Sequence, residues 1–406
     1  MASAFERLLT HGPAAIVAEV IIGAVVADAL LLGFIMLRRA YRKRYFARRD
    51  LRVYELRQEW EAMISGEIPY DAWRRNAFDR RIVEELALDA MEAATNDESP
   101  RLLSFMRGTG LIDKRIFEAR EHRGWRRLRA LVALGRTRAA EGIPALAEAL
   151  RDADTETRHA ALRGLGRIGL PEAAEEILNW LGEAGLRVSP LPLQNALIHS
   201  CRERPRMLLP YLQYADRPVR EVLARVFGEI ATDASQAEAL MLACDELPEL
   251  RAAAARALAH TSQQGLAFEA LLELARDAVW FVRLRAVVAL GEMGGAAATS
   301  PLLCALRDSN RLVRMRAAEA LAARQGDMTP IFGEVVASKD RYALHAYLTA
   351  IENAGLRPTL EDELQRRKSR RAFGAEPLLA VLRAERVNAA RGEEEQIADP
   401  ATVAKP

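Results

Sequence analysis

Six arginines recur at a nearly constant interval through the middle of the chain. The steps between them are 31, 62, 31, 32 and 31 residues, and a glycine or alanine follows each arginine after eight residues. The long step spans two periods. The arginines are Arg127, Arg158, Arg220, Arg251, Arg283 and Arg314. A period of this size, kept over about 200 residues, is typical of stacked repeats that cannot fold one by one.

One period contains two helical segments. In residues 143–165, apolar side chains recur at three- and four-residue steps along each segment, and a short polar turn separates the two. Pro144 suits the first turn of the first segment, and Asp154 can cap the second. Neither segment can bury its apolar stripe alone, so neighbouring repeats must stack. The pattern predicts an all-α solenoid of helix pairs over residues 121–355.

Aspartates stand six residues before four of the periodic arginines, and these are Asp152, Asp245, Asp277 and Asp308. Each carboxylate falls in the turn between two helices, and the arginine falls in the first turn of the second helix. The two groups can pair within a repeat or between neighbouring repeats through charge-assisted hydrogen bonds. We interpret the six arginines and four aspartates as a structural ladder and not as a binding site.

Two stretches show the repeat most completely: RDAVWFVRLRAVVALG, residues 276–291, and RDSNRLVRMRAAEALA, residues 307–322. They resemble HEAT and HEAT-like (bilin-lyase-type) repeats, and the resemblance extends over residues 121–353. It implies an array whose second helices line a concave face, the usual surface for protein partners. It implies no particular partner, because such arrays serve many.

A second arginine follows each ladder arginine after two or five residues, positions that are neighbours on one helix face. The row is Arg129, Arg163, Arg225, Arg256, Arg285 and Arg316. It predicts a basic stripe along the concave face that suits phosphate, carboxylate or an acidic peptide. In the alternative reading, interspersed glutamates such as Glu229 and Glu319 neutralise the row. Nucleic acid is not an expected partner, because the row lacks interleaved aromatic residues and the net charge is only +2.

Residues 14–37 form an apolar stretch long enough to cross a bilayer, with only Glu19 and Asp28 charged. Seven basic residues follow within residues 38–49. Because positive charge resists translocation, we expect a single-pass protein of the cytoplasmic (inner) membrane with its N-terminus outside and the array inside. A cleaved signal peptide is the alternative. It would place its basic residues before the apolar stretch and a small-residue cleavage site after it.

Asp28 lies near the middle of this stretch, where an ionised carboxylate costs about 2.5–3.5 kcal/mol. Gly23, Ala24 and Ala27 are small enough to admit a second helix close by. We interpret these four residues as a contact with an integral membrane protein. The alternative is a protonated or snorkelling aspartate in a span that has no partner.

The remaining boundaries follow from breaks in the pattern. We expect a short outer N-terminus over residues 1–13, a basic juxtamembrane helix over 38–65, helical caps over 66–120 and 356–387, and a disordered tail over 388–406. One repeat is irregular: Ser189 stands where an arginine is due, with Pro190 and Pro192 beside it, and the stretch EAGLRVSPLP, residues 183–192, is predicted to form a longer loop. His345 takes the arginine position of the last repeat.

No grouping of residues indicates catalysis. The six histidines are scattered, no HExxH or glycine-rich phosphate loop is present, and the three cysteines have no metal-ligand spacing. We expect no enzyme activity, cofactor, metal or small-molecule substrate. The order of membrane span, tryptophan-containing cap and array resembles bacterial envelope accessory proteins, which implies a membrane-anchored scaffold for a partner such as a polysaccharide glycosyltransferase. The alternatives are a bilin-lyase-type enzyme and a lipid sensor that binds anionic headgroups through residues 38–49.

Overall fold

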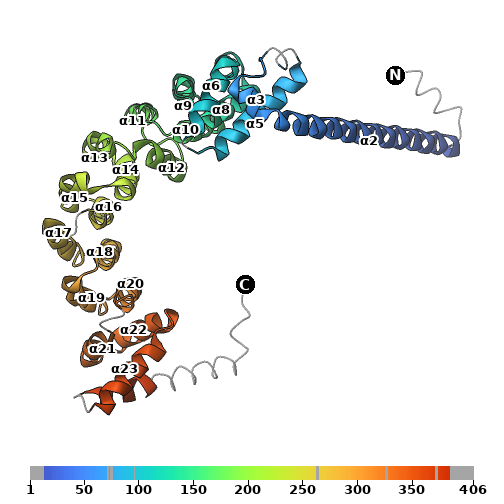
Figure 1. The fold of residues 1–406 in the computed structure, drawn as a ribbon. Coiled ribbons are helices and arrows are strands. Elements are labelled where there is room, and N and C mark those ends of the chain that lie inside the picture. Colours follow the sequence, from blue (N-terminus) through green and yellow to red (C-terminus); the bar gives the residue numbers. More distant parts are fainter. Residues whose placement is uncertain are drawn as a thin grey trace. The chain divides into compact units, whose positions relative to one another are not determined.

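The computed structural model describes residues 13–70, 73, 76–95, 97–261, 265–324, 328–370 and 374–384, with side chains from Val20 onward. Every regular element in these ranges is a helix, which confirms the predicted all-α class (Figure 1). The chain divides into an N-terminal unit, Met1–Glu118, and a C-terminal unit, Ala119–Pro406. The disordered tail predicted for residues 388–406 lies outside the described residues, as does nearly all of the predicted N-terminal segment.

A single helix, α2 (Pro13–Gln58), contains both the apolar stretch and most of the basic segment. No proline or glycine interrupts residues 38–65, so nothing breaks the helix where its composition changes. All side chains from Val20 to Leu37 are exposed. Among the described helices, α2 alone is long and apolar enough to cross a membrane. After Glu59 the chain continues as α3 (Trp60–Ser65), which Gly66 ends in a left-handed conformation with φ +83°.

The end of α2 packs into the N-terminal unit. The helices α5 (Ala77–Ala93), α6 (Ser99–Gly108) and α7 (Leu111–Glu121) follow. Phe105 is buried and its ring lies 5.7 Å from Trp60 and 6.0 Å from Trp73. Arg52 of α2 donates two hydrogen bonds to the carboxylate of Asp79 on α5, at 3.1 and 2.9 Å. The basic half of α2 is therefore part of a packed core and not only a surface for lipid.

The C-terminal unit is built of helix pairs. The first helices of the pairs are α9 (Ile143–Leu150), α11 (Pro171–Ala184), α13 (Leu209–Tyr214), α15 (Gln236–Ala243), α17 (Leu266–Leu274), α19 (Thr299–Ala305) and α21 (Met328–Ala337). The second helices are α10 (Thr155–Ile168), α12 (Pro190–Cys201), α14 (Arg217–Ile230), α16 (Pro248–Ala259), α18 (Trp280–Met293), α20 (Arg311–Ala322) and α22 (Arg341–Asn353). Before them comes α8 (Gly124–Thr137), and after them come α23 (Arg357–Ser369) and a helix at residues 375–384.

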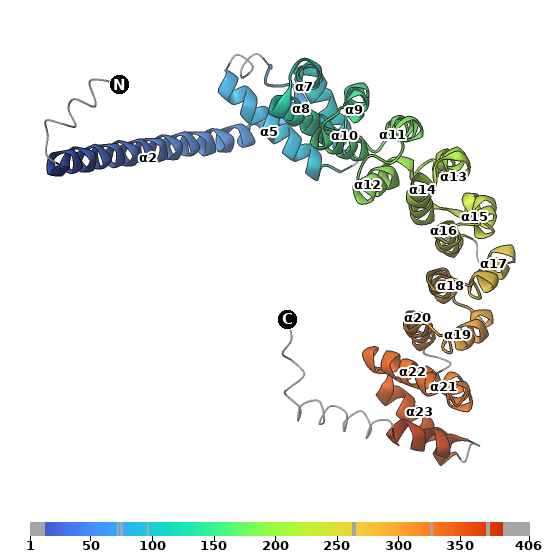
Figure 2. The same cartoon turned by 180° about the vertical axis from the view of Figure 1, so that it is seen from behind.

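These helices form two rows. Each second helix packs against the next second helix, from α8 through α22, and we call this series the inner row. Figures 1 and 2 show it along the inside of the curve of this unit, with the first helices outside as the outer row. The predicted solenoid is confirmed. It arises because an apolar stripe on each helix faces both its pair mate and its neighbours in the row.

The small residue eight positions after each ladder arginine marks where inner-row helices cross. A Cβ on Gly135 would lie 2.5 Å from the Cα of Gly164 on the next inner helix. A Cβ on Gly166 would lie 2.6 Å from the Cα of Ala196 on α12. Both contacts are shorter than real Cβ atoms tolerate, so glycine at these positions sets the spacing between α8, α10 and α12. The recurrent small residue is thus a packing requirement.

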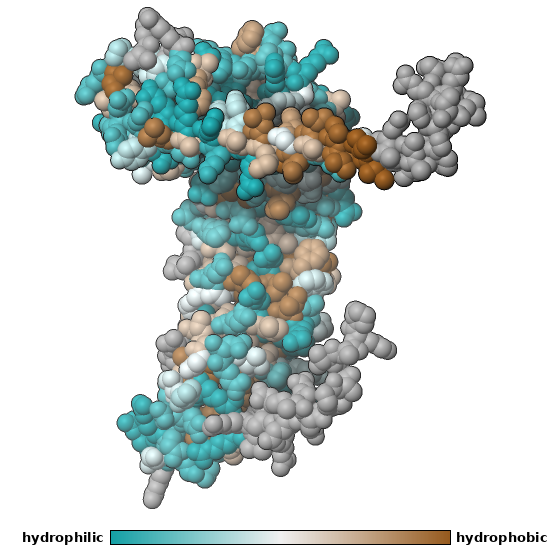
Figure 3. All heavy atoms as spheres, turned by 90° about the vertical axis from the view of Figure 1, so that its right-hand side faces the viewer, coloured by the Kyte–Doolittle hydropathy of each residue, from teal (hydrophilic) through white to brown (hydrophobic). Residues whose placement is uncertain are grey.

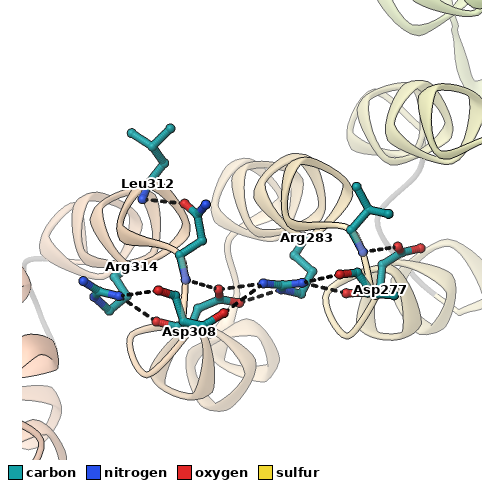
Figure 4. Close-up of polar contacts among 9 residues, drawn as sticks. Asp277, Arg283, Asp308, Leu312 and Arg314 are labelled. Atoms are coloured by element: carbon teal, nitrogen blue, oxygen red, sulfur yellow. Dashed lines mark hydrogen bonds and ion pairs between the residues drawn. The ribbon is translucent and has the colours of Figure 1, made fainter.

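Four of the six ladder arginines pair with the aspartate of the following repeat, and Figure 4 shows this pairing for Arg283 and Asp308. Arg158 and Arg314 instead donate to backbone carbonyls of their own turn. Arg283 donates to both carboxylate oxygens of Asp308, at 2.6 and 2.8 Å, and to the backbone carbonyls of Asp277 and Ala278, at 2.8 and 3.1 Å. Asp308 also accepts the backbone N–H of Asn310 at 2.7 Å, which fixes its own turn. The same inter-repeat pairs join Arg127 to Asp152, Arg220 to Asp245 and Arg251 to Asp277. Of the two arrangements the sequence allowed, the carboxylate pairing is between repeats.

Two sequence expectations about irregular repeats are wrong. The segment between α11 and α12 covers residues 185–189, the same length as residues 275–279 between α17 and α18. Ser189 is the residue before the first turn of α12, and Pro190 fits that turn because its missing N–H needs no partner there. In the last repeat, the helix starts align Leu344, and not His345, with Arg314.

Replacing Asp308 by Asn should destabilise the C-terminal unit by about 1.5–3 kcal/mol, because a half-buried guanidinium loses its ionic partner. We expect a lower thermal unfolding midpoint for the full chain in detergent. As a control, Glu319→Gln removes an exposed pair with Arg316 and should cost under about 0.5 kcal/mol. Equal effects of both changes would contradict a structural role for the ladder.

The same variant should respond less to acid. Burial raises the pKa of Asp308, but hydrogen bonds from Arg283 and from the Asn310 N–H more than offset this, so its pKa lies below the ordinary value. A lowered folded-state pKa contributes stability that is present above the unfolded value of about 3.9 and is lost as the pH falls below it. The stability difference between wild type and Asp308→Asn should therefore shrink between about pH 5 and pH 3. A constant difference would contradict this.

Gly135→Ala should destabilise the C-terminal unit although alanine favours helices by about 1 kcal/mol. The added Cβ would force α8 and α10 apart, and such overpacking costs about 1–3 kcal/mol. The matched control is Gly333→Ala in the interior of α21, where a Cβ would meet only Leu378 Cδ1 at 3.9 Å. It should leave the unfolding midpoint unchanged or raise it. A stabilised Gly135→Ala protein would overturn the crossing argument.

Candidate functional site

Three of the six arginines of the predicted basic stripe, Arg225, Arg256 and Arg285, line a common groove. The other three are accounted for separately. Arg129 lies 5.7 Å from the ring of Trp125, Arg163 is exposed on α10, and Arg316 pairs with Glu319 at 2.6 Å. The three groove arginines thus lie on successive inner helices, and a stripe that includes all six stays a prediction.

The groove spans four consecutive helices of the inner row and has a volume of about 600 Å³. Helix α12 contributes Leu191 and Ile198, and α18 contributes Trp280 and Phe281. Leu191 is 65% exposed and Trp280 is 41% exposed. Figure 3 faces this inner row and shows hydrophobic side chains gathered partway along it, bordered by hydrophilic ones. Exposed aromatic and aliphatic side chains beside guanidinium groups are typical of protein-binding surfaces.

The charges of the groove do not cancel. Arg256 pairs with Glu229 across the helices α14 and α16. Arg225 and Arg285 are exposed and form no ion pair among the described residues. Burial lowers the pKa of Arg256, the nearby Arg285 lowers it further, and Glu292 opposes both. The predicted neutralisation by glutamates therefore holds for Arg256 and Arg316, while two arginines stay available to an anionic partner.

The aromatic residues of the groove were missed by sequence reasoning, which took the row to lack them. Trp280 and Phe281 occupy the first turn of α18, where α8 and α22 also carry an aromatic residue, Trp125 and Tyr342. The two adjacent aromatic residues in RDAVWFVRLRA could have indicated an exposed aromatic site, because side chains at the start of a second helix lie at the surface of the inner row. The rings contact each other edge to face with centroids 5.9 Å apart.

The four residues of the predicted intramembrane contact lie together on α2. Gly23 and Ala27 are four residues apart, as are Ala24 and Asp28, so all four share one face. Their side chains are exposed, and nothing lies within 4 Å of a Cβ placed on Gly23. Asp28 thus lies in the apolar half of α2, beside the small residues Gly23, Ala24 and Ala27. These small residues let another helix approach closely.

The basic segment after the apolar stretch divides into two parts. Arg49 pairs with Glu85 of α5 at 2.8 Å, and Arg48 lies 5.9 Å from the ring of Phe78. The hydrogen bond with Glu85 raises the pKa of Arg49, and burial opposes this rise. The other five basic residues, Arg38, Arg39, Arg42, Lys43 and Arg44, are exposed. Arg48 is exposed as well, so Arg49 is the one basic residue within residues 38–49 whose side chain is partly buried.

Among the described residues, no group of three or more histidine, cysteine, aspartate or glutamate side chains is arranged to hold a metal ion. Cys201 is buried, and burial raises the pKa of its thiol to about 12, so the thiol stays protonated near neutral pH. Cys244 and Cys304 are exposed on outer-row segments.

Comparison with known families identifies the repeats. The HEAT-repeat family matches residues 119–187, 237–322 and 268–352. These residues form HEAT repeats. The groove lies partly outside the matched residues. Its helices α16 and α18 fall within them, and its helices α12 and α14 do not. No curated protein matches the chain in sequence.

The solved structures that match the chain share little sequence with it. An engineered protein is 17% identical, with a TM-score of 0.35, over 77% of this chain and 97% of its own. The complex of CpcE and CpcF of phycocyanin lyase from Nostoc sp. is 17% identical, with a TM-score of 0.26, over 66% of this chain and 94% of its own. Human deoxyhypusine hydroxylase is 22% identical, with a TM-score of 0.26, over 67% of this chain and 97% of its own.

Proposed function

We propose that the protein is a membrane-anchored scaffold whose HEAT-repeat array holds a protein partner and performs no catalysis of its own. The observation that carries this proposal is the groove on α12, α14, α16 and α18, where unpaired arginines lie beside exposed Trp280 and Leu191. Such a surface suits a protein segment that carries both acidic and apolar side chains. Tryptophan and arginine are the residue types that most often dominate binding energy at protein interfaces.

The length of the groove supports a macromolecular partner over a small molecule. It crosses four helices, and it is lined by side chains from residues as far apart in the chain as Leu191 and Arg285. An extended or helical acidic segment can contact Arg225 and Arg285 together while its apolar side chains cover Trp280. Three arginines line the groove against two glutamates, Glu229 and Glu249. Arg225 and Arg285, which form no ion pair among the described residues, favour carboxylate groups, because each contact with arginine can be bidentate.

The membrane anchor in this proposal is α2, with its N-terminus outside and the chain from residue 38 onward in the cytoplasm of a bacterial cell. Support comes from the exposed apolar surface of residues 20–37 and from the five exposed basic residues that follow directly. Positive charge on the side that is not translocated sets this orientation. The same residues can bind anionic headgroups at about 1 kcal/mol per charge, which strengthens anchoring without making the protein a lipid sensor.

The integral membrane partner in this proposal contacts the face of α2 formed by Gly23, Ala24, Ala27 and Asp28. A polar partner group in the bilayer would offset the cost of Asp28 there. The combination of a membrane contact and a cytoplasmic groove fits an accessory of a membrane glycosyltransferase that builds or exports envelope polysaccharide. No observation in the groove favours the lyase alternative, because nothing there singles out a chromophore-binding side chain.

Anchoring predicts that the full chain stays in the membrane fraction after alkaline carbonate extraction, with its apolar N-terminal stretch still present by mass spectrometry. Asp28→Leu should remain in the membrane but should lose at least half of the crosslinks formed by a photoreactive residue at position 24. A soluble, shortened chain would show that the stretch is a cleaved signal. Unchanged crosslinking would contradict the intramembrane contact.

Groove binding predicts that a photoreactive residue replacing Leu191 forms a specific protein adduct in native membranes. The matched control replaces Met241 on the outer row, which is 63% exposed against 65% for Leu191. The adduct should fall at least tenfold when Arg225 and Arg285 are both changed to Glu, with helix content unchanged by circular dichroism. Equal adducts from positions 191 and 241, or an adduct that survives the double change, would refute the proposal.

A further inference from the structure

In the last repeat, the residue at the aspartate position of the ladder is a serine. Asp308 accepts the backbone N–H two residues later, from Asn310, and Asn310 in turn accepts the N–H of Leu312 at 2.8 Å. In the next repeat Ser338 accepts the N–H of Asp340 at 3.3 Å, and Asp340 accepts the N–H of Tyr342 at 2.8 Å. These matching bonds align Ser338 with Asp308. A serine hydroxyl therefore stands where every preceding rung from Arg220 onward has a carboxylate.

By the same alignment, Arg314 is the arginine whose partner in the ladder would stand at Ser338. Its Nη1 donates to the backbone carbonyls of Asp308 and Ser309, at 2.8 and 3.1 Å, as Arg283 does in the repeat before (Figure 4). Arg283 also binds a carboxylate through Nε and Nη2. Arg314 forms no ion pair within the part of the chain that the structure describes. Two hydrogen bonds from Nη1 thus hold the guanidinium of Arg314 as they hold that of Arg283. The Nε and Nη2 atoms, which bind a carboxylate in Arg283, bind none in Arg314 among the described residues.

The surroundings of Arg314 form a site for an anionic group. It lines a pocket of about 260 Å³ between α20 and α22, together with Arg311, His345 and Tyr342. The Tyr342 ring lies 5.3 Å from the guanidinium carbon of Arg314 and 5.2 Å from that of Arg341, so it orients both cations. The one carboxylate in the pocket, Glu319, pairs with Arg316 at 2.6 Å. Met315 and Ala346 provide apolar walls.

We propose that this pocket binds a carboxylate group of a peptide, which completes the last rung through Nε and Nη2 of Arg314. The two preceding rungs supply the chemical template, because the same Nε–Nη2 edge of Arg251 and of Arg283 receives an aspartate from the next repeat. A short apolar side chain beside the carboxylate would lie against Met315 and Ala346. The pocket is separate from the groove on α12–α18, and the inference does not depend on what that groove binds.

Three probe peptides distinguish the source of the carboxylate. Acetyl-Gly-Leu-Asp-Leu-Gly-amide carries only a side-chain carboxylate, and acetyl-Gly-Leu-Asn-Leu-Gly carries only a terminal one. The uncharged control is acetyl-Gly-Leu-Asn-Leu-Gly-amide. Binding to the full chain in detergent micelles is measured by calorimetric titration. We expect one of the charged peptides to bind at least tenfold more tightly than the amide control. Equal affinities for all three peptides would overturn the proposal.

Two variants locate the binding. Ser338→Asp restores the missing carboxylate from within the chain, so it should weaken peptide binding at least tenfold while the thermal midpoint stays equal or rises. Arg314→Gln should weaken binding by a similar factor, and it decides the matter if Ser338→Asp unfolds. Arg276→Gln, which removes a 75% exposed arginine on another repeat, is the charge-matched control and should have no effect. The Arg225→Glu, Arg285→Glu protein should bind the peptide normally. Binding that survives Arg314→Gln would refute the site.

Discussion

The pairing of an arginine with the aspartate of the following repeat is the interaction on which the array depends. The guanidinium groups of Arg251 and Arg283 show the full set of contacts: each binds two carbonyls of its own turn, crosses to the next repeat, and orients a carboxylate that accepts a backbone N–H of that repeat's turn. A solenoid has only nearest-neighbour contacts, so a polar bond made between repeats fixes their register in a way that apolar packing alone does not. Positions of close crossing, such as Gly135 against Gly164, add a steric limit to the same spacing.

The fold could be predicted from the sequence because each type of residue that recurs with the period has one structural role. The interval of about 31 residues, the turn aspartates and the small residues all point to stacked helix pairs, and consistency of this kind specifies a fold. The sequence could not choose between pairing within and between repeats, because the turn brings both partners within reach of the same guanidinium. It also misjudged Ser189 and Pro190, whose turn-forming character suits the start of a helix as well as a loop.

The candidate site was only partly predictable. Periodicity places Arg225, Arg256 and Arg285 on one face, but the groove exists because α12 and α18 bring Leu191 and Trp280 to the same surface from residues far apart in the chain. Spacing along one helix carries no information about such neighbours. The incomplete rung at Arg314 was hidden for a related reason. The last repeat departs from the period by one residue, so Ser338 is recognised as the aspartate position only through its hydrogen bond to Asp340.

The continuity of α2 has a mechanical consequence. Residues 38–58 extend the apolar stretch as uninterrupted helix for about 30 Å before the chain turns. With α2 across the bilayer as proposed, no flexible joint separates the lipid from the N-terminal unit, and the bonds from Arg52 to Asp79 fix the helix to that unit. The helix then acts as a rigid shaft. A rotation or tilt imposed on it by a neighbouring membrane protein is transmitted directly to the helices around Phe105, and their height above the bilayer is set by the length of the shaft.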